Sequence, residues 1–292
     1  MICTACPRKC RVQRTENTPS GGFCKMPYNA VVARAALHAW EEPPISGKNG
    51  SGAIFFSGCS LRCVFCQNEK ISRENFGKPV SKAHFIEIMQ SLEAQGAHNI
   101  NLVNPTHFTP FLAEALQAYK PKIPVVYNSG GYDSVASLRQ LEGLVDIYLP
   151  DFKYISPETA RAMAAAPDYP EIAKAAILEM RRQVQDTFSK DGMMQSGLLI
   201  RHLVLPGYAK ASVSVLQWLA DHLSKDTYIS LMSQYTPCGR TYADKHLCRR
   251  LTSAEYDRVV AAFWDCGFHN GFMQARTAAS ADFIPAFDLT GV

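Results

Sequence analysis

The feature that most constrains the fold of this 292-residue chain is an alternation of strand-like and helix-like segments after residue 50. Short apolar runs are typical of buried strands, and amphipathic stretches with apolar residues at i, i+3, i+4 and i+7 lie between them. This order predicts βαβ units and a parallel sheet, either barrel-like or doubly wound. The predicted strands are residues 52–57, 99–104, 123–128, 145–152, 198–205 and 228–233.

Three cysteines follow the first predicted strand directly. Cys59, Cys63 and Cys66 have C-x3-C-x2-C spacing, and their loop falls at the carboxyl edge of the sheet, where such folds form their sites. Fe–S clusters are normally held by four thiolates, so three thiolates on a four-iron cluster leave one iron open to a small molecule. A structural zinc site needs four ligands, and Gln67 and Asn68 are poor candidates for the fourth. Three unliganded core thiols are the other alternative.

A second cysteine group lies at the start of the chain, with C-x2-C-x3-C-x13-C spacing. Few large apolar side chains accompany it, so a metal that supplies folding energy is expected. Zinc and an auxiliary Fe–S cluster both fit four thiols, and a metal-free segment is the remaining alternative. We therefore predict a Cys-rich metal-binding module over residues 1–50 and a core domain with a C-terminal helix and tail over 51–292. The four thiols are Cys3, Cys6, Cys10 and Cys24.

The cysteine triplet, with Phe65 before its last member, resembles the signature of the radical S-adenosylmethionine (SAM) superfamily. Further segments resemble the activating enzymes of glycyl radical enzymes, and more narrowly the pyruvate formate-lyase activating enzyme homologues called PflX-type. The resemblance runs from about residue 51 to about 240 and implies a partial (β/α)6 TIM barrel. The segments that carry it are Phe55-Phe56-Ser57-Gly58 and Gln67-Asn68 around the cysteines, Asn128-Ser129-Gly130-Gly131, Asp146 to Lys153, and Leu199 to Gly207.

The resemblance implies a [4Fe–4S] cluster on the three cysteines, with SAM chelated by the open iron. One electron from the cluster cleaves SAM to a 5′-deoxyadenosyl radical, which in this family abstracts hydrogen from a glycine of a partner glycyl radical enzyme. The implied electron donor is a flavodoxin or ferredoxin-type protein. A radical SAM enzyme that modifies another peptide, a nucleotide or a small metabolite is the second hypothesis. A non-catalytic Fe–S or zinc interaction protein is the third.

Polar residues near the ends of predicted strands are candidate contacts of SAM or substrate. Asp151 and Lys153 are two positions apart and so face the same side of a strand; we predict them as catalytic residues, with an ordinary internal ion pair as the alternative. Arg201 suits bidentate recognition of a carboxylate or of ribose hydroxyls, unless it is a surface arginine. His202 has the opposite parity and should face the helices. The predicted cofactor contacts are Phe65, Asn104, Thr106, Asn128, Ser129, Asp151 and Arg201.

The chain departs from the family pattern in two places. Asn104-Pro-Thr-His107 stands where the family has Gly-Gly-Glu, which leaves backbone carbonyls and Thr106 to hold the SAM ammonium. His107 is then either a substrate contact or a core histidine. Asn128 stands where the family has an Asp, so we do not expect the cation-binding site that some members of the family carry. Cys238 follows the last predicted strand and either reaches the site or is an unliganded thiol.

Composition and charge exclude several other classes. The net charge is only +4, without a long basic run, so we expect no nucleic-acid partner. The apolar stretch from Ala30 to Trp40 is interrupted by Arg34 and His38 and is too short to cross a bilayer. The first residues lack the features of a signal peptide, and ten cysteines in an unsecreted chain favour metal binding or redox chemistry. We expect a cytoplasmic protein with no membrane partner.

We predict that the N-terminal cysteines bind a structural metal of their own. The apparent zinc-binding energy of small modules, about 10–16 kcal/mol, would offset part of the ~1–2 kcal/mol per residue that backbone ordering costs. The measurement is metal analysis of a variant with Cys59, Cys63 and Cys66 replaced by Ala. Residual zinc near one equivalent would support a zinc site, and residual iron with sulfide an auxiliary cluster. Neither metal, with residues 1–30 still ordered, would refute the second site.

Overall fold

The main structural element is a mostly parallel sheet covered by helices. The computed structural model describes residues 1–238, 244–274 and 285–292. Within these residues the strand order is β10-β9-β8-β6-β5-β4-β2-β1-β3, with β7 paired to β8. Neighbours from β2 to β10 are parallel, whereas β1 and β3 are antiparallel at one edge. The strands are β1 (Val31–His38), β2 (Ser51–Phe56), β3 (Lys78–Pro79), β4 (Ile100–Val103), β5 (Val125–Ser129), β6 (Ile147–Pro150), β7 (Thr187–Phe188), β8 (Met194–Leu203), β9 (Tyr228–Met232) and β10 (Gly271–Met273).

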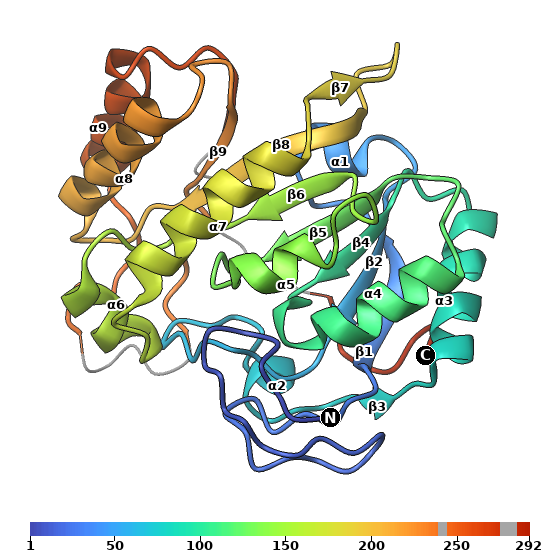
Figure 1. The fold of residues 1–292 in the computed structure, drawn as a ribbon. Helices are drawn as coiled ribbons and strands as arrows, with labels where there is room; N and C mark the ends of the chain where they lie inside the picture. Colours follow the sequence, from blue (N-terminus) through green and yellow to red (C-terminus); the bar gives the residue numbers. More distant parts are fainter. Residues whose placement is uncertain (239–243, 275–284) are drawn as a thin grey trace.

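Helices connect the parallel strands and pack on one face of the sheet (Figure 1). Their apolar faces follow the helical period; in α3, for example, Phe85, Ile88 and Leu92 are buried. None of the described helices is long and apolar enough to cross a membrane. The helices are α1 (Pro43–Ser46), α2 (Glu69–Ser72), α3 (Lys82–Ala94), the 3-10 turn η1 (Thr106–Phe108), α4 (Thr109–Ala118), α5 (Val135–Arg139), α6 (Pro157–Ala164), α7 (Tyr169–Gln183), α8 (Ala209–His222) and α9 (Ser253–Asp265).

The six predicted strands are all present, as β2, β4, β5, β6, β8 and β9. The α/β fold and its parallel sheet are therefore confirmed, and the sheet does not close into a complete barrel. β6 ends at Pro150, earlier than predicted, since proline has no N–H for the ladder. Asp151 still bridges to Arg201 of β8, and Lys153 lies in the loop beyond.

β1 lies within the apolar stretch from Ala30 to Trp40 but was not predicted as a strand, and it pairs antiparallel with β2. This edge strand is buried in its first half and partly exposed in its second, so it shows neither clean alternation nor a continuous apolar run. Residues 31–38 of the predicted 1–50 module thus belong to the main sheet. A separate N-terminal module, now limited to about residues 1–30, remains a prediction.

The C-terminal residues 285–292 lie along the outer edge of β1. The amide of Ala35 donates to the carbonyl of Thr290 at 2.8 Å, and Arg34 forms a 3.0 Å ion pair with Asp288. Phe287 is only 6% exposed and packs beside Phe55. The preceding part of the predicted tail, 275–284, lies outside the described residues.

We expect Phe287→Ala to lower the free energy of unfolding by about 3–5 kcal/mol, because it removes a buried aromatic ring from the interior. Denaturant titration of the purified protein measures this change. Leu178→Ala on α7, at a side chain 41% exposed, is the matched control and should shift stability by no more than about 0.5 kcal/mol. Equal effects of the two substitutions would contradict the packing of the tail.

Candidate active site

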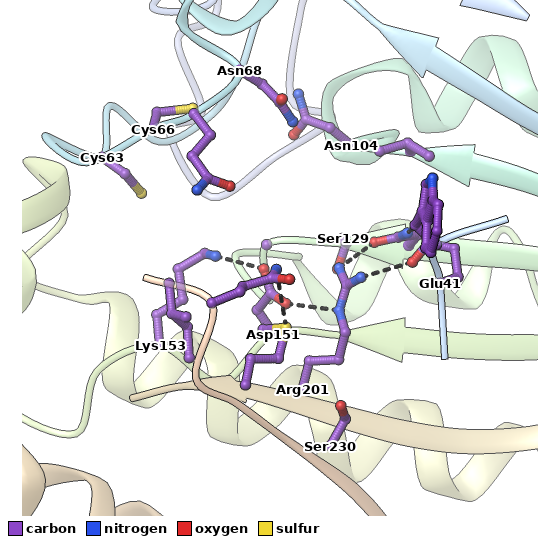
Figure 2. Close-up of a pocket in the computed structure, with 18 of the residues that line it drawn as sticks. Glu41, Cys63, Cys66, Asn68, Asn104, Ser129, Asp151, Lys153, Arg201 and Ser230 are labelled. Carbon is purple, nitrogen blue, oxygen red and sulfur yellow. Dashed lines mark hydrogen bonds and ion pairs between the residues drawn. The ribbon is translucent and has the colours of Figure 1, made fainter. Parts of the chain in front are cut away.

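A cavity of about 370 Å³ lies at the carboxyl edge of the sheet. The cysteine loop after β2 lines one end, and the segment before α1 lines another. Figure 2 shows Cys63 and Cys66 on one side and Ser230 on the other, with Asp151 and Arg201 between them. Side chains from strands far apart in the sequence therefore meet in one enclosed space.

The cysteine loop is fixed to the end of β4 by Asn104. This residue has φ +61°, a left-handed conformation that Asn tolerates better than most residues. Its Nδ2 donates to the carbonyl of Gly58 at 2.6 Å, and its Oδ1 accepts from Cys59 Sγ at 3.5 Å. The segment that replaces the family's Gly-Gly-Glu thus orients the loop that carries the thiols.

All three thiols of the triplet line the cavity. Burial raises the pKa of Cys59 and Cys63, and the neighbouring thiols raise it further. Thiolates that repel one another are stabilised by a positively charged metal centre. A structural zinc site takes four ligands, and this loop supplies three thiols. A four-iron cluster binds each thiolate to a different iron, so this loop fits a cluster.

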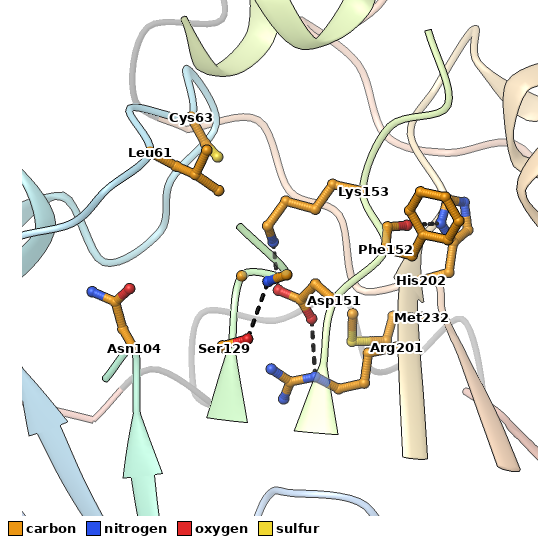
Figure 3. Close-up of polar contacts among 12 residues, drawn as sticks. Leu61, Cys63, Asn104, Ser129, Asp151, Phe152, Lys153, Arg201, His202 and Met232 are labelled. Carbon is orange, nitrogen blue, oxygen red and sulfur yellow. Dashed lines mark hydrogen bonds and ion pairs between the residues drawn. The ribbon is translucent and has the colours of Figure 1, made fainter. Parts of the chain in front are cut away.

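Arg201 is the centre of a network of ion pairs and hydrogen bonds (Figure 2), and Figure 3 shows Asp151 between Arg201 and Lys153. Its Nε donates to Asp151 Oδ1 at 3.0 Å, and one terminal nitrogen donates to Glu41 Oε2 at 3.0 Å. The other donates to Asn128 Oδ1 at 2.5 Å. Lys153 Nζ donates to Asp151 Oδ2 at 2.5 Å. All five residues line the cavity, so Asp151 and Lys153 form the ion pair considered above and also face the candidate site.

These groups remain charged although they are buried. Burial acts to raise the pKa of Asp151, but Lys153 and Arg201 outweigh it and the pKa is lowered. Burial acts to lower the pKa of Lys153, yet the carboxylate of Asp151 outweighs it and the pKa is raised. The cavity therefore presents fixed charges at neutral pH, as is common in active sites.

Thr106 is the one predicted cofactor contact that does not line the cavity. Its hydroxyl donates to Asp133 Oδ1 at 2.6 Å, and Ser129 donates to Oδ2 of the same carboxylate at 2.6 Å. Asp133 is a buried acceptor that also receives the Tyr127 hydroxyl and was not predicted. The structure therefore gives Thr106 a structural role. The other predicted contacts line the cavity: Phe65, Asn104, Asn128, Ser129, Asp151 and Arg201.

Both histidines near the strand ends belong to the core. His107 is fully buried, bonds the carbonyl of Ser57 through Nε2 at 2.8 Å, and has its pKa lowered to about 3 by burial. His202 faces α8, as its parity predicted, and bonds Ser212 Oγ at 2.8 Å. Neither histidine lines the cavity. The thiol of Cys238 donates to the carbonyl of Phe65 at 3.2 Å and also lies outside the cavity lining.

The sequence patterns did not predict that Glu41 and Tyr169 contribute to the site. Glu41 precedes α1 in a segment with no periodic pattern, and the acidic pair before Pro-Pro was the only available signal. Tyr169, the first residue of α7, donates to the carbonyl of Asp151 and accepts from the amide of Lys153, both at 2.9 Å. This hydroxyl holds the turn that presents both charged side chains.

The N-terminal segment packs against the cysteine loop. Arg8 donates to the carbonyl of Ser60 at 2.9 Å and to that of Ala165, just after α6, at 2.7 Å. Its guanidinium lies 3.9 Å from the ring centroid of Phe23. Residues 1–30 therefore brace the loop that carries the triplet (Figure 1).

The four N-terminal thiols lie near one another. Burial raises the pKa of Cys6 to about 12, with smaller contributions from Cys24, Cys3 and Cys10. No three of them are arranged as a metal-ion site among the described residues, so the geometry supports neither of the predicted alternatives, zinc or an Fe–S cluster. A second metal remains a prediction.

Comparison with known proteins indicates the superfamily to which this chain is similar. The model of the Radical SAM superfamily matches residues 53–195, just under half of the chain. Residues 53–195 are thus similar to the Radical SAM superfamily domain, and the α/β fold with its mostly parallel, unclosed sheet agrees with that superfamily. An uncharacterized protein of Methanocaldococcus jannaschii is 28% identical over 270 residues, which cover 88% of this chain and 73% of that protein.

Solved structures share the fold at low identity. HydG, a maturase of the [FeFe]-hydrogenase, matches with a TM-score of 0.51 and 12% identity over 80% of this chain and 54% of its own. Streptococcus suis SuiB bound to S-adenosylmethionine matches with a TM-score of 0.49 and 9% identity over 75% of this chain and 48% of its own. The chain spans about half the length of these proteins, and the likeness to HydG concerns the fold alone.

We expect Arg201→Met to lower the free energy of unfolding by about 3–5 kcal/mol, because it leaves the buried carboxylates of Asp151 and Glu41 without their shared partner. Lys82 has a side chain 48% exposed and pairs with the exposed Glu114, so Lys82→Met should cost about 0–1 kcal/mol. Urea unfolding of both variants makes the comparison. A loss at position 201 no larger than that at position 82 would contradict the network described here.

Proposed function

We propose that this radical SAM enzyme is a PflX-type activating enzyme that abstracts hydrogen from a glycine of a partner glycyl radical enzyme. The observation that carries the proposal is the meeting of the cysteine triplet with Asp151, Lys153 and Arg201 in one cavity. The residues that resemble activating enzymes thus gather at one site, although they are distant in sequence. We include in the proposal that Cys59, Cys63 and Cys66 hold the cluster.

The bound cofactors would supply the radical chemistry, because one electron from the cluster cleaves SAM to a 5′-deoxyadenosyl radical. The protein supplies orientation and exclusion of water. Lys153 lies near enough to Cys63 to oppose the rise of its pKa, which suits it to bind an anionic group beside the thiols. Phe65, which packs edge-on against Tyr154 and Tyr235, forms an aromatic wall that keeps water out.

Fixed charge in the cavity suits a ligand that carries charges of both signs. The Arg201 network holds Asp151 and Asn128 in one geometry, and so limits the movement of groups that would orient SAM. Outside the cavity, the mildly basic chain suits an acidic flavodoxin or ferredoxin-type electron donor.

A different peptide, a nucleotide or a small metabolite as the substrate is the second candidate. It is favoured by the carboxyl groups of Glu41 and Glu42, which line the cavity. Figure 2 places Glu41 on the side away from Cys63 and Cys66. A bare glycine backbone carries no group that requires such charges. This candidate keeps the same cofactors and changes only the molecule that loses hydrogen.

We expect the anaerobically reconstituted and reduced protein to produce 5′-deoxyadenosine from SAM. When it is mixed with a glycyl radical enzyme from the same organism, we expect a glycyl radical signal in electron paramagnetic resonance. The variant with Cys59, Cys63 and Cys66 replaced by Ala should give neither product. Deoxyadenosine without a glycyl radical on any such partner would reject activation in favour of another substrate, and deoxyadenosine from the triple variant would reject the cluster ligands.

A further inference from the structure

Two adjacent glutamates line the cavity, and among the described residues only Glu41 has an ion-pair partner. Glu41 Oε1 accepts from Asn101 and Asn128, both at 3.1 Å, and its Oε2 accepts from Arg201. Glu42 is only 7% exposed and also lines the cavity. Its Oε2 accepts no hydrogen bond from any residue of 1–238, 244–274 or 285–292.

The two cations among the described lining residues, Arg201 and Lys153, already have carboxylate partners. Arg201 donates from its Nε and both terminal nitrogens to Asp151, Glu41 and Asn128, and Lys153 pairs with Asp151. The described residues that line the cavity therefore include three carboxyl groups, those of Asp151, Glu41 and Glu42, and two cations. Burial raises the pKa of Glu42, because a buried carboxylate without a cation of its own is costly. The ionised form of Glu42 therefore needs a cation that the described residues do not supply.

A hydroxyl lies beside Glu42. Ser230, on β9, is 1% exposed and lines the cavity. Burial raises the pKa of Glu42, and the nearby hydroxyl of Ser230 acts in the opposite direction as a weak hydrogen-bonding neighbour. That contact falls short of full hydrogen-bond geometry, since Ser230 Oγ and Glu42 Oε2 both lack a partner in the described ranges. Figure 2 places Ser230 beyond Arg201, on the side away from Cys63 and Cys66. A carboxyl group and a hydroxyl thus share one corner of the cavity, and both oxygens can accept a hydrogen bond from a bound group.

We propose that Glu42 and Ser230 form a subsite for a cationic organic group of the substrate, a guanidinium or an ammonium. Such a group would balance the excess negative charge and donate hydrogen bonds to both oxygens. A divalent metal ion is the poorer fit, because it needs several convergent oxygen ligands and no such group of three acidic, His or Cys side chains is found in the described chain.

This inference rests on the proposed function in one respect, which is that the substrate enters this cavity. A molecule that reached from the thiols past Arg201 would place its cationic end at Glu42 and its reacting carbon near the cysteine loop. The cation could belong to an arginine or lysine side chain of a protein substrate or to a small amine. Both sources present the same chemistry to the subsite.

The test uses reconstituted enzyme with SAM bound and two probes that differ in charge. N-acetyl-arginine amide carries the guanidinium, and N-acetyl-citrulline amide is its neutral isostere. Isothermal titration calorimetry should show at least about tenfold tighter binding of the arginine probe, the gain of one charge-assisted contact. Glu42→Gln should bring the two probes to within about twofold. Glu87→Gln, at an exposed side chain of α3, should keep the wild-type preference.

Several outcomes decide the proposal. Ser230→Ala should reduce the preference about threefold and serves as the second variant if Glu42→Gln fails to fold. Equal or undetectable binding of both probes by the wild type, or an unchanged preference in Glu42→Gln, would overturn the subsite. Butylguanidine as a third probe separates the sources, because binding equal to that of the arginine probe indicates a small amine and weaker binding a peptide. Glycyl radical formation, measured on the same preparations, reports independently on the proposed function.

Discussion

The site depends on the guanidinium of Arg201. Its three nitrogens join β8 to Asp151 after β6, to Asn128 of β5 and to Glu41 in front of α1. These contacts link three parallel strands to a segment that belongs to none of them. Buried charges are tolerated only when they are paired with good geometry, so the position of each of these groups depends on the others. Arginine suits this place better than lysine, because its planar fork can serve three acceptors at once.

The same network explains how the cavity can hold several buried charges, because each of these groups is paired with an opposite charge or a hydrogen-bond partner. Asp151 is shared between Arg201 and Lys153, and Tyr169 fixes the backbone that carries it. Asp151 and Lys153 thus form a balanced pair, whereas Glu42 has no cation of its own among the described residues. Under the proposed function, the balanced pair would orient the cofactor, and under the proposed subsite Glu42 would select the substrate.

Local periodicity was enough to predict the parallel sheet and the buried faces of the helices. The strand ends were also predictable, since polar residues that follow buried runs converge at one edge; Asn128, Asp151 and Arg201 are examples. Thr106 was predicted as a cofactor contact, because its hydrogen-bond partner Asp133 lies in a loop and shows no pattern that would predict the contact. Glu41 and β1 were missed for a related reason, since an edge strand and a crossing segment are fixed by tertiary contacts and not by local sequence. The comparisons support a similarity to the Radical SAM superfamily. The roles proposed for individual residues depend on the geometry of the cavity.

The pairing of residues 285–292 with β1 has a consequence for biogenesis. Ala35 and its partner Thr290 are separated by about 255 residues, which ribosomes take roughly 13–50 s to synthesise at about 5–20 residues per second. Throughout that interval the outer edge of β1 offers unpaired backbone groups to other chains. The nascent protein is therefore exposed to edge-to-edge association for most of its synthesis, and chaperone capacity during expression becomes a determinant of yield that the finished fold does not reveal.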